Sequence, residues 1–309
     1  MVAGAVVLLV VLSALAAPLF AKYVAHTNPF MSNINGHTMV GGVSVPVMQQ
    51  SSEGLGLGVT PLGPTWDLGH YFLGADGQGR DVMARLLYGG RDSLLIGITS
   101  ALICCALAVV LGATAGYLGG AVDGVLSRLF DVVWAFPVYL LAICLSVVLL
   151  THGLVVGPVH IGAGSLLVPI FIIAVVYVPY VGRALRAQVI SLRRQEFIQA
   201  GIATGAGDLR ILARDVLPNI LPTVIVFVPL MTALNMLIES ALSFLSVGVQ
   251  PPNASWGTII NDGLALLYTR PAVTLAPGLM IALTAGALNV LGDGVRDALD
   301  PNARLRGSI

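Results

Sequence analysis

Charged side chains are scarce in this chain of 309 residues, and their scarcity excludes several classes of protein. Asp, Glu, Lys and Arg together make up 10% of the residues, whereas 57% are hydrophobic. A soluble domain carries about 25% charged residues, so the composition excludes a soluble enzyme and a disordered chain. Because the formal net charge is +0, no bulk positive field would attract a nucleic acid. The composition therefore predicts a protein of the lipid bilayer.

Lysine is almost absent, because Lys22 is the only one in the chain. A phosphate-binding loop of the Walker A type needs Gly-Lys-Ser/Thr, so the chain has no such loop. It also lacks the H-E-x-x-H and G-x-S-x-G motifs, and its three cysteines lie in apolar runs that suggest no disulfide framework. We assign no catalytic residue, metal ligand or bound cofactor. Uphill transport would need an ion gradient or a partner ATPase.

Long uncharged stretches indicate how often the chain crosses the bilayer, since a spanning helix needs about 20 mostly apolar residues. The stretches are residues 2–21, 93–122, 132–182, 216–238 and 271–292. The third can hold two helices, and the fourth continues past Glu239. They predict an all-α membrane protein of six transmembrane helices, one in residues 1–21 and five in a core of residues 93–309. Ala14-Leu15-Ala16 resembles a signal cleavage site, but the length of the first stretch favours an uncleaved helix.

The placement of basic residues predicts the orientation of the chain. Residues 22–92 hold most of the histidines and many Gly and Pro residues, so we expect an extracytoplasmic segment with little regular structure. With the N-terminus inside, ten basic residues face the cytoplasm: Arg128, the six arginines between 183 and 214, Arg296, Arg304 and Arg306. Five face outside, four of them in the long segment. We therefore predict an N-in, C-in topology.

The cytoplasmic stretch 183–222 is too polar to span the bilayer, and it leads into the next helix at Pro218, where proline suits a first turn. Its part 196–206 is rich in small residues. If this part is helical, Phe197, Gly201 and Thr204 share one face. Such a helix could fit into a groove of another protein. A solvated basic loop at the membrane surface explains the composition equally well.

Glycines recur every four residues at the end of the second span. Residues at this spacing let helices approach closely in lipid. We expect helix packing at Gly112 and Gly116, and a turn formed by Gly119, Gly120 and Gly124.

Glu239 is a carboxylate inside an apolar stretch, where it should face protein or water. Asn235 lies one turn before it and could share a hydrogen bond with it. One interpretation is a pathway or gate site that includes Asn235, Glu239 and Phe244. The other, which we favour, is a buried hydrogen-bonded anchor for the segment that follows.

The basic stretch resembles the EAA loop of binding-protein-dependent ABC importer permeases, in outline E-A-A-x3-G-x9-I-x-L-P. The match runs from Gln199-Ala200-Gly201 through Gly205 to Leu217-Pro218. The resemblance places an ATPase-coupling loop in residues 186–217, and its expected contact residues are Glu196, Gln199, Ala200, Gly201, Thr204, Gly205, Asp215, Leu217 and Pro218. Gln199, Gly201 and Asp215 depart from the family pattern. Asp215 could pair with Arg210, Arg214 or a partner's arginine.

Other segments resemble the C-type subunit of the dipeptide/oligopeptide branch of these permeases. They are Leu73–Val82 (LGADGQGRDV), Tyr88–Leu94 (YGGRDSL), Gly116–Asp123, Ala135–Pro137, Glu239–Leu245, Gln250–Pro252, Ser255–Gly257 (SWG) and Asn289–Pro301. They occur in order over residues 73 to 301. Residues 21–72 match no pattern of this family.

The resemblance implies a type I ABC importer permease in the cytoplasmic (inner) membrane of a bacterium. It implies a homologous B-type sister permease, two ATP-binding subunits and an extracytoplasmic substrate-binding protein as partners. ATP and Mg would be bound by the partner ATPases and not by this chain. The implied substrates are peptides of the dipeptide/oligopeptide class. The alternative is a secondary transporter or channel that works alone.

Overall fold

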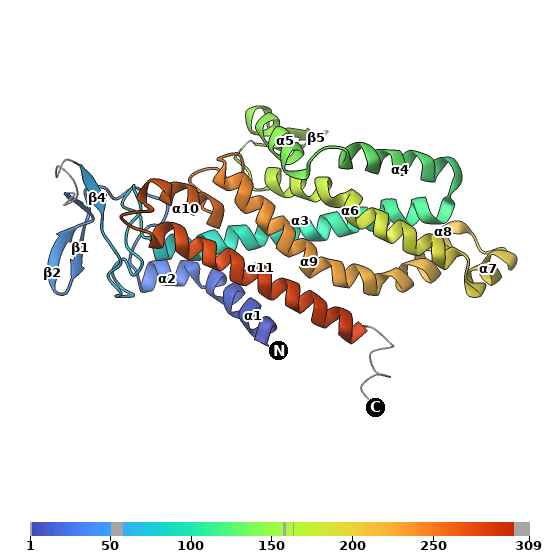
Figure 1. Cartoon of the computed structure of the whole chain (residues 1–309), viewed down its shortest axis with the longest axis horizontal. Helices are drawn as coiled ribbons and strands as arrows, with labels where there is room; N and C mark the ends of the chain where they lie inside the picture. The colour runs from blue at the N-terminus through green and yellow to red at the C-terminus, as the bar shows by residue number, and fades with distance from the viewer. Residues whose placement is uncertain (1, 51–57, 157–158, 163, 300–309) are drawn as a thin grey trace.

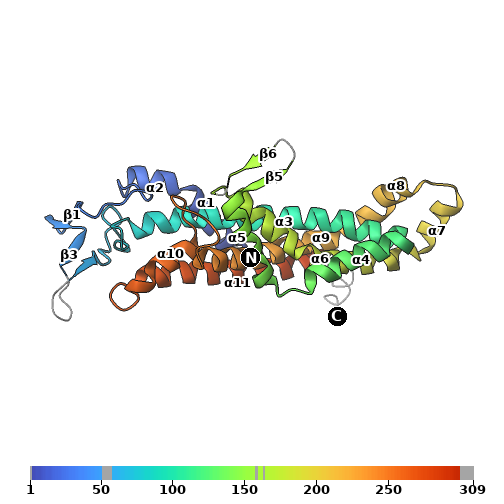
Figure 2. The ribbon, with the colours of Figure 1, turned by 90° about the horizontal axis from the view of Figure 1, so that it is seen from above.

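Four long helices form the body of the molecule. The computed structural model describes residues 2–50, 58–156, 159–162 and 164–299, without side-chain detail for residues 154–156 and 159–160. The long helices are α3 (Val82–Leu118), α6 (Leu167–Arg193), α9 (Leu217–Phe244) and α11 (Ala272–Leu299). They run along the long axis of the molecule, with small strands at one end and the short helix α7 (Glu196–Ala203) at the other (Figure 1, Figure 2).

Within the described residues, four helical stretches are long and apolar enough to cross a membrane, and two bent pairs can raise this number to six. One pair is α1 (Val2–Leu15) with α2 (Ala17–Tyr23), bent by 50°; the other is α4 (Gly120–Trp134) with α5 (Val138–His152), bent by 86°. A proline lies at each bend. Pro18 is in the first turn of α2, and Pro137 is the extended N-cap of α5, where the missing N–H and the fixed φ interrupt the helix.

Helix α3 begins well before the apolar stretch that starts at Ser93. The Asp81 side chain caps it by accepting a hydrogen bond from the backbone N–H of Ala84 at 3.0 Å. At 37 residues, the helix is about 55 Å long, whereas the hydrocarbon core is about 30 Å thick. Its first turns therefore extend beyond the bilayer, into the region where we expected an irregular segment.

The segment before α3 contains short strands, contrary to the expectation of little regular structure. The strands β1 (His37–Val40) and β2 (Val43–Pro46) form one antiparallel pair, and β3 (Met48–Gln50) and β4 (Val59–Pro61) form another. Gly41 and Gly42, both with positive φ, form the two-residue turn between β1 and β2. We call residues 24–81 the outer segment. A third small pair, β5 (Leu154–Val156) and β6 (Val159–Ile161), follows α5.

The largest apolar core lies between α3, α6 and α9. Glycines permit the close crossing of α3 and α6. A Cβ atom added at Gly112 would lie 2.6 Å from the Gly182 carbonyl oxygen, and one at Gly116 would lie 2.7 Å from the Arg186 carbonyl oxygen. Gly119 and Gly120 form the turn after α3 with positive φ. Gly124, which we expected in that turn, instead lies inside α4 because the helix resumes at Gly120.

A second core joins α1 and α11 to the outer half of α3 and to the short helix α10 (Trp256–Gly263). After α10, a 3-10 turn (Leu264–Leu266) leads into α11. The expectations for Asp300, Pro301, Arg304 and Arg306 lie outside the described residues.

Candidate functional site

The predicted coupling loop forms a compact helical cap at the end of the bundle opposite the outer segment (Figure 1). After α6, the chain forms α7, the short helix α8 (Asp208–Ile211), a π-helical turn η1 (Leu212–Val216) and then α9. Ile198 and Ile211 are fully buried and fix the inner face of the cap. The phenol of Tyr117 at the end of α3 donates a hydrogen bond to Asp208 at 3.1 Å. The cap is therefore attached to the bundle.

Gly205 ends α7 in a Schellman motif. Its φ is +80°, a conformation that favours glycine. The backbone N–H of Ala206 donates to the Gly201 carbonyl at 3.1 Å, and that of Gly205 donates to Ile202 at 3.0 Å. This pattern defines the motif. Thr204 adds a hydrogen bond from its hydroxyl to the Ala200 carbonyl at 3.1 Å.

The outer face of α7 is open to solvent and partly apolar. Phe197 is 47% exposed, Ile202 is 42% exposed, and Leu209 in α8 is 81% exposed. Glu196, Gln199 and Ala200 are also exposed, and Gln199 donates to the carbonyl of Arg193 at 2.7 Å. Of the predicted face, Phe197 and Thr204 are exposed, whereas Gly201 is half-buried against Ile211. The predicted contact residues on this face are therefore mostly accessible.

The structure bears on two expectations for the end of this loop. Among the described residues, Asp215 makes no ion pair, so neither Arg210 nor Arg214 is its partner, and a partner's arginine stays a prediction. Pro218 lies in the first turn of α9 beside Leu217, as expected, although the helical run that contains α9 starts earlier, at Asp208. Proline cannot donate to the carbonyl four residues before it. The wide π turn directly before α9 accommodates this missing bond without ending the helix.

Glu239 is fully buried in α9 and links three elements. Ser93 of α3 donates to its carboxylate at 2.9 Å, and Ser243 donates to it at 2.7 Å. The Ser93 oxygen also accepts the backbone N–H of Trp256 at 3.2 Å, and the Ser243 oxygen accepts that of Val249 at 3.0 Å. The carboxylate therefore holds α3, the end of α9 and the chain leading to α10 together.

The other two predicted pathway residues lie apart from the Glu239 carboxylate. Asn235 is buried and hydrogen-bonds with Ser100 of α3 at 2.9 Å, and not with Glu239 as we had expected. Phe244 is half-buried in the last turn of α9, where its carbonyl accepts a hydrogen bond from the Asn261 side chain of α10. Asn235 and Glu239 thus join α9 to α3 at two separate positions along the helices, through Ser100 and Ser93 respectively.

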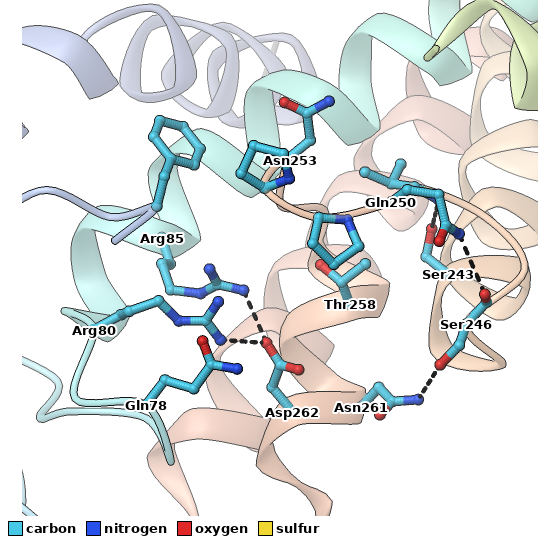
Figure 3. Close-up of a pocket in the computed structure, with 14 residues that line it drawn as sticks. Gln78, Arg80, Arg85, Ser243, Ser246, Gln250, Asn253, Thr258, Asn261 and Asp262 are labelled. Atoms are coloured by element: carbon cyan, nitrogen blue, oxygen red, sulfur yellow. Dashed lines mark hydrogen bonds and ion pairs between the residues drawn. The ribbon is translucent and has the colours of Figure 1, made fainter. Parts of the chain in front are cut away.

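A largely buried ion-pair cluster at the outer end was missed by the sequence reasoning. Arg80, Arg85 and Asp262 meet beside a cavity of about 530 Å³ (Figure 3), and Asp76 pairs with both arginines. Asp76 and Arg80 belong to the Leu73–Val82 motif and pair across the turn before α3, so the motif was the available signal. Asp262 is 182 residues from Arg80, and no local pattern connects the two.

Among the described residues, no group of three or more His, Cys, Asp or Glu side chains could hold a metal ion. The geometry thus shows a membrane bundle with an exposed helical cap at one end and a tightly paired polar region at the other.

Comparison with known proteins identifies the family. Residues 108–305 match the family of binding-protein-dependent transport system inner membrane components. The oligopeptide transport system permease protein OppC of Haemophilus influenzae is 36% identical over 241 residues, covering 78% of this chain and 73% of that protein. The dipeptide transport system permease protein DppC of Bacillus subtilis is 40% identical over 238 residues, covering 76% and 69%. The glutathione transport system permease protein GsiD of Pectobacterium atrosepticum is 35% identical over 234 residues, covering 76% and 73%.

A solved structure supports the fold. An inward-facing structure of the MetNI methionine ABC transporter superposes with a TM-score of 0.56 at 17% identity, covering 71% of this chain and 97% of that chain. This likeness concerns the architecture alone, which is that of a type I ABC importer permease. Together with the family match over most of the bundle, it shows that the chain belongs to the binding-protein-dependent transport system inner membrane components.

Proposed function

We propose that this chain is a membrane permease subunit of an ATP-driven importer for peptides of the dipeptide/oligopeptide class. One observation carries this proposal: the three relatives above match about three quarters of the chain at 35–40% identity, and their names describe permeases for oligopeptides, dipeptides and glutathione. In this function the chain forms the translocation pathway with a homologous sister permease. It catalyses no reaction itself, and ATP and Mg are bound by two partner ATPases.

The cap formed by α7 and α8 is the proposed contact to one ATPase. Its support is the exposed face that includes Phe197, Ala200 and Leu209 on a cap fixed from within by Ile198 and Ile211. A small residue such as Ala200 lets a helix sit deep in a groove, and exposed apolar side chains gain from burial there. ATP-driven closure of the ATPases would then bias the bundle between two states.

The proposed setting is the bacterial inner membrane, with both ends of the chain inside. In this orientation the α7 cap is cytoplasmic and the outer segment faces an extracytoplasmic substrate-binding protein. Arginine placement supports it, because Arg183, Arg186, Arg193 and Arg194 lie on α6 or directly after it, at the end that carries the cap.

The alternative of a transporter or channel working alone finds less support. Such a protein couples to an ion through charged groups that line its path. Glu239, the carboxylate deepest in an apolar stretch, is fully buried and engaged with serine hydroxyls. The family match also favours the importer.

Co-purification tests the proposal. A tagged chain, extracted from its native membrane in mild detergent, is expected to bring down a second permease and two ATPase polypeptides. An unrelated multi-pass membrane protein with the same tag serves as the control. Recovery of the chain with neither ATPase nor sister permease would contradict the proposed function.

A further inference from the structure

The ion-pair cluster joins the outer segment, α3 and α10 into one contact (Figure 3). The Asp262 carboxylate of α10 accepts hydrogen bonds from Arg80 at 2.8 Å and from Arg85 at 2.9 Å. Arg80 also pairs with Asp76 at 2.7 Å, and Arg85 lies 3.4 Å from the same carboxylate. The Arg85 guanidinium donates further to the Pro29 carbonyl at 3.2 Å. Two cations and two anions therefore balance one another.

Burial makes this cluster costly to separate. Asp76 is 1% exposed, Arg85 is 2% exposed and Arg80 is 8% exposed, whereas the Asp262 side chain is 36% exposed. If Asp262 moved away with α10, two buried guanidinium groups would face the single carboxylate of Asp76. Solvent weakens the attraction of the partly exposed Asp262, but two buried guanidinium groups left with one carboxylate are still unfavourable, and we expect the separated arrangement to be about tenfold rarer than the paired one.

At the start of α10, uncharged contacts hold this helix to α3. The indole N–H of Trp256 donates to the Leu86 carbonyl at 2.9 Å. A Cβ atom added at Gly90 would lie 2.9 Å from the Trp256 ring, so this glycine permits the contact. The Ser255 hydroxyl caps α10 by accepting the N–H of Thr258 in a capping box. Helix α10 is thus attached to α3 near its start through Trp256 and near its end through Asp262.

We propose that Asp262, Arg80 and Arg85 are positioning residues that hold α10 and the outer segment together as one rigid block throughout the transport cycle. The inference rests on the proposed function, because it concerns the moving parts of an importer. It means that α10 does not open away from α3 as a lid, so that the outer opening of the pathway forms elsewhere, between this block and other elements. The motifs LGADGQGRD and SWG then have a shared role, since each supplies one side of the block.

Charge balance is the first test, and it does not depend on transport. Asp262→Asn leaves two buried cations against one anion, and we expect the yield of folded complex in detergent to fall about tenfold. The double variant Arg80→Gln/Asp262→Asn restores balance with one cation and one anion. It should recover most of that yield although it removes more contacts. If the double variant is no better than Asp262→Asn alone, the cluster does not position α10 through its charges.

Cross-linking across the cavity is the second test. Gln78 and Asn253 line it from the outer segment and from the chain before α10 (Figure 3). In a background with Cys104, Cys105 and Cys144 replaced, Gln78→Cys and Asn253→Cys are joined by a bifunctional thiol reagent that spans the cavity and is released by reductant. ATP-driven peptide uptake by the reconstituted complex should stay within about twofold of the unlinked rate. A change of this size is far smaller than the tenfold loss expected if the cross-link blocked a required movement.

The two possible failures are distinguishable. Loss of uptake on cross-linking, reversed by reductant, would show that the cavity walls must separate and would overturn the rigid block. Absence of ATP-driven uptake in the unlinked complex would instead contradict the proposed function. The yields of the charge variants would still test whether the ion pairs position α10.

Discussion

At the scale of single residues, buried polar side chains define how the helices of this permease are held together. Glu239 and Asn235 lie in apolar sequence, and the sequence alone marks them as costly and in need of partners. It could not identify the partners, because Ser93 and Ser100 lie on a different helix more than a hundred positions away. The hydrogen bonds favour the anchor interpretation of Glu239 over a gate.

Replacing Glu239 by Ala tests the anchor. The change leaves the hydroxyls of Ser93 and Ser243 without their acceptor and opens a void, so unfolding in detergent should become easier by about 2–5 kcal/mol. Thermal unfolding of the purified complex measures this loss. Asp293→Ala, which removes an exposed carboxylate on α11, is the control and should change stability little. A Glu239→Ala protein of normal stability that no longer transports would favour the gate.

Gly112 offers a second residue-scale prediction. Gly112→Ala would place a Cβ 2.6 Å from the Gly182 carbonyl oxygen, so α3 and α6 would have to separate. We expect a loss of about 1–3 kcal/mol in stability, the usual range for overpacking. Gly124→Ala on α4 meets no atom within 4 Å, and better helix propensity should leave it neutral or slightly stabilised. Equal effects of the two changes would show that the close crossing is unimportant.

At the scale of elements, the best-predicted feature is the helical cap formed by α7 and α8. The small residues and the family pattern placed a helix near 196–206, and the structure has α7 at Glu196–Ala203. The ends of elements were harder to predict. Asp81 starts α3 early as its N-cap, and the π turn carries the helix through Pro218. Both depend on local hydrogen bonds that apolar periodicity does not reveal.

The cap also carries a prediction about coupling. Ala200 is exposed on α7, so Ala200→Glu should leave the fold intact while adding bulk and charge to the surface proposed to bind the ATPase. We expect uptake to fall at least about tenfold, the effect of losing roughly 1.4 kcal/mol of binding, with normal amounts of chain in the membrane. Ala200→Ser keeps the side chain small and is the matched control. Retained ATP-dependent uptake in Ala200→Glu would refute the coupling assignment.

At the scale of the whole molecule, composition predicted the class of protein but not its shape. Uncharged stretches predict helices where α3, α6, α9 and α11 lie, because the bilayer requires them. The stretches do not predict the bends at Pro18 and Pro137, which turn two of the six expected spans into bent pairs. The strands of the outer segment were missed as well, because runs of three or four residues are too short for alternation to be a clear signal.

The ion-pair cluster at the outer end likewise could not be predicted, because it joins residues that are far apart in the sequence. The fold brings together residues of the Leu73–Val82 motif and Asp262, and tertiary packing alone sets that distance. A motif can therefore indicate that its residues share a role without identifying the distant residue with which they pair.

Peptide accumulation in proteoliposomes tests the central claim most directly. The chain is reconstituted with its sister permease, both ATPases and the binding protein, with ATP enclosed on the side of the α7 cap and a labelled dipeptide on the side of the outer segment. The account predicts accumulation above the external concentration that requires ATP hydrolysis and stops with a non-hydrolysable analogue. Accumulation by this chain alone, driven by an ion gradient without ATP, would contradict it.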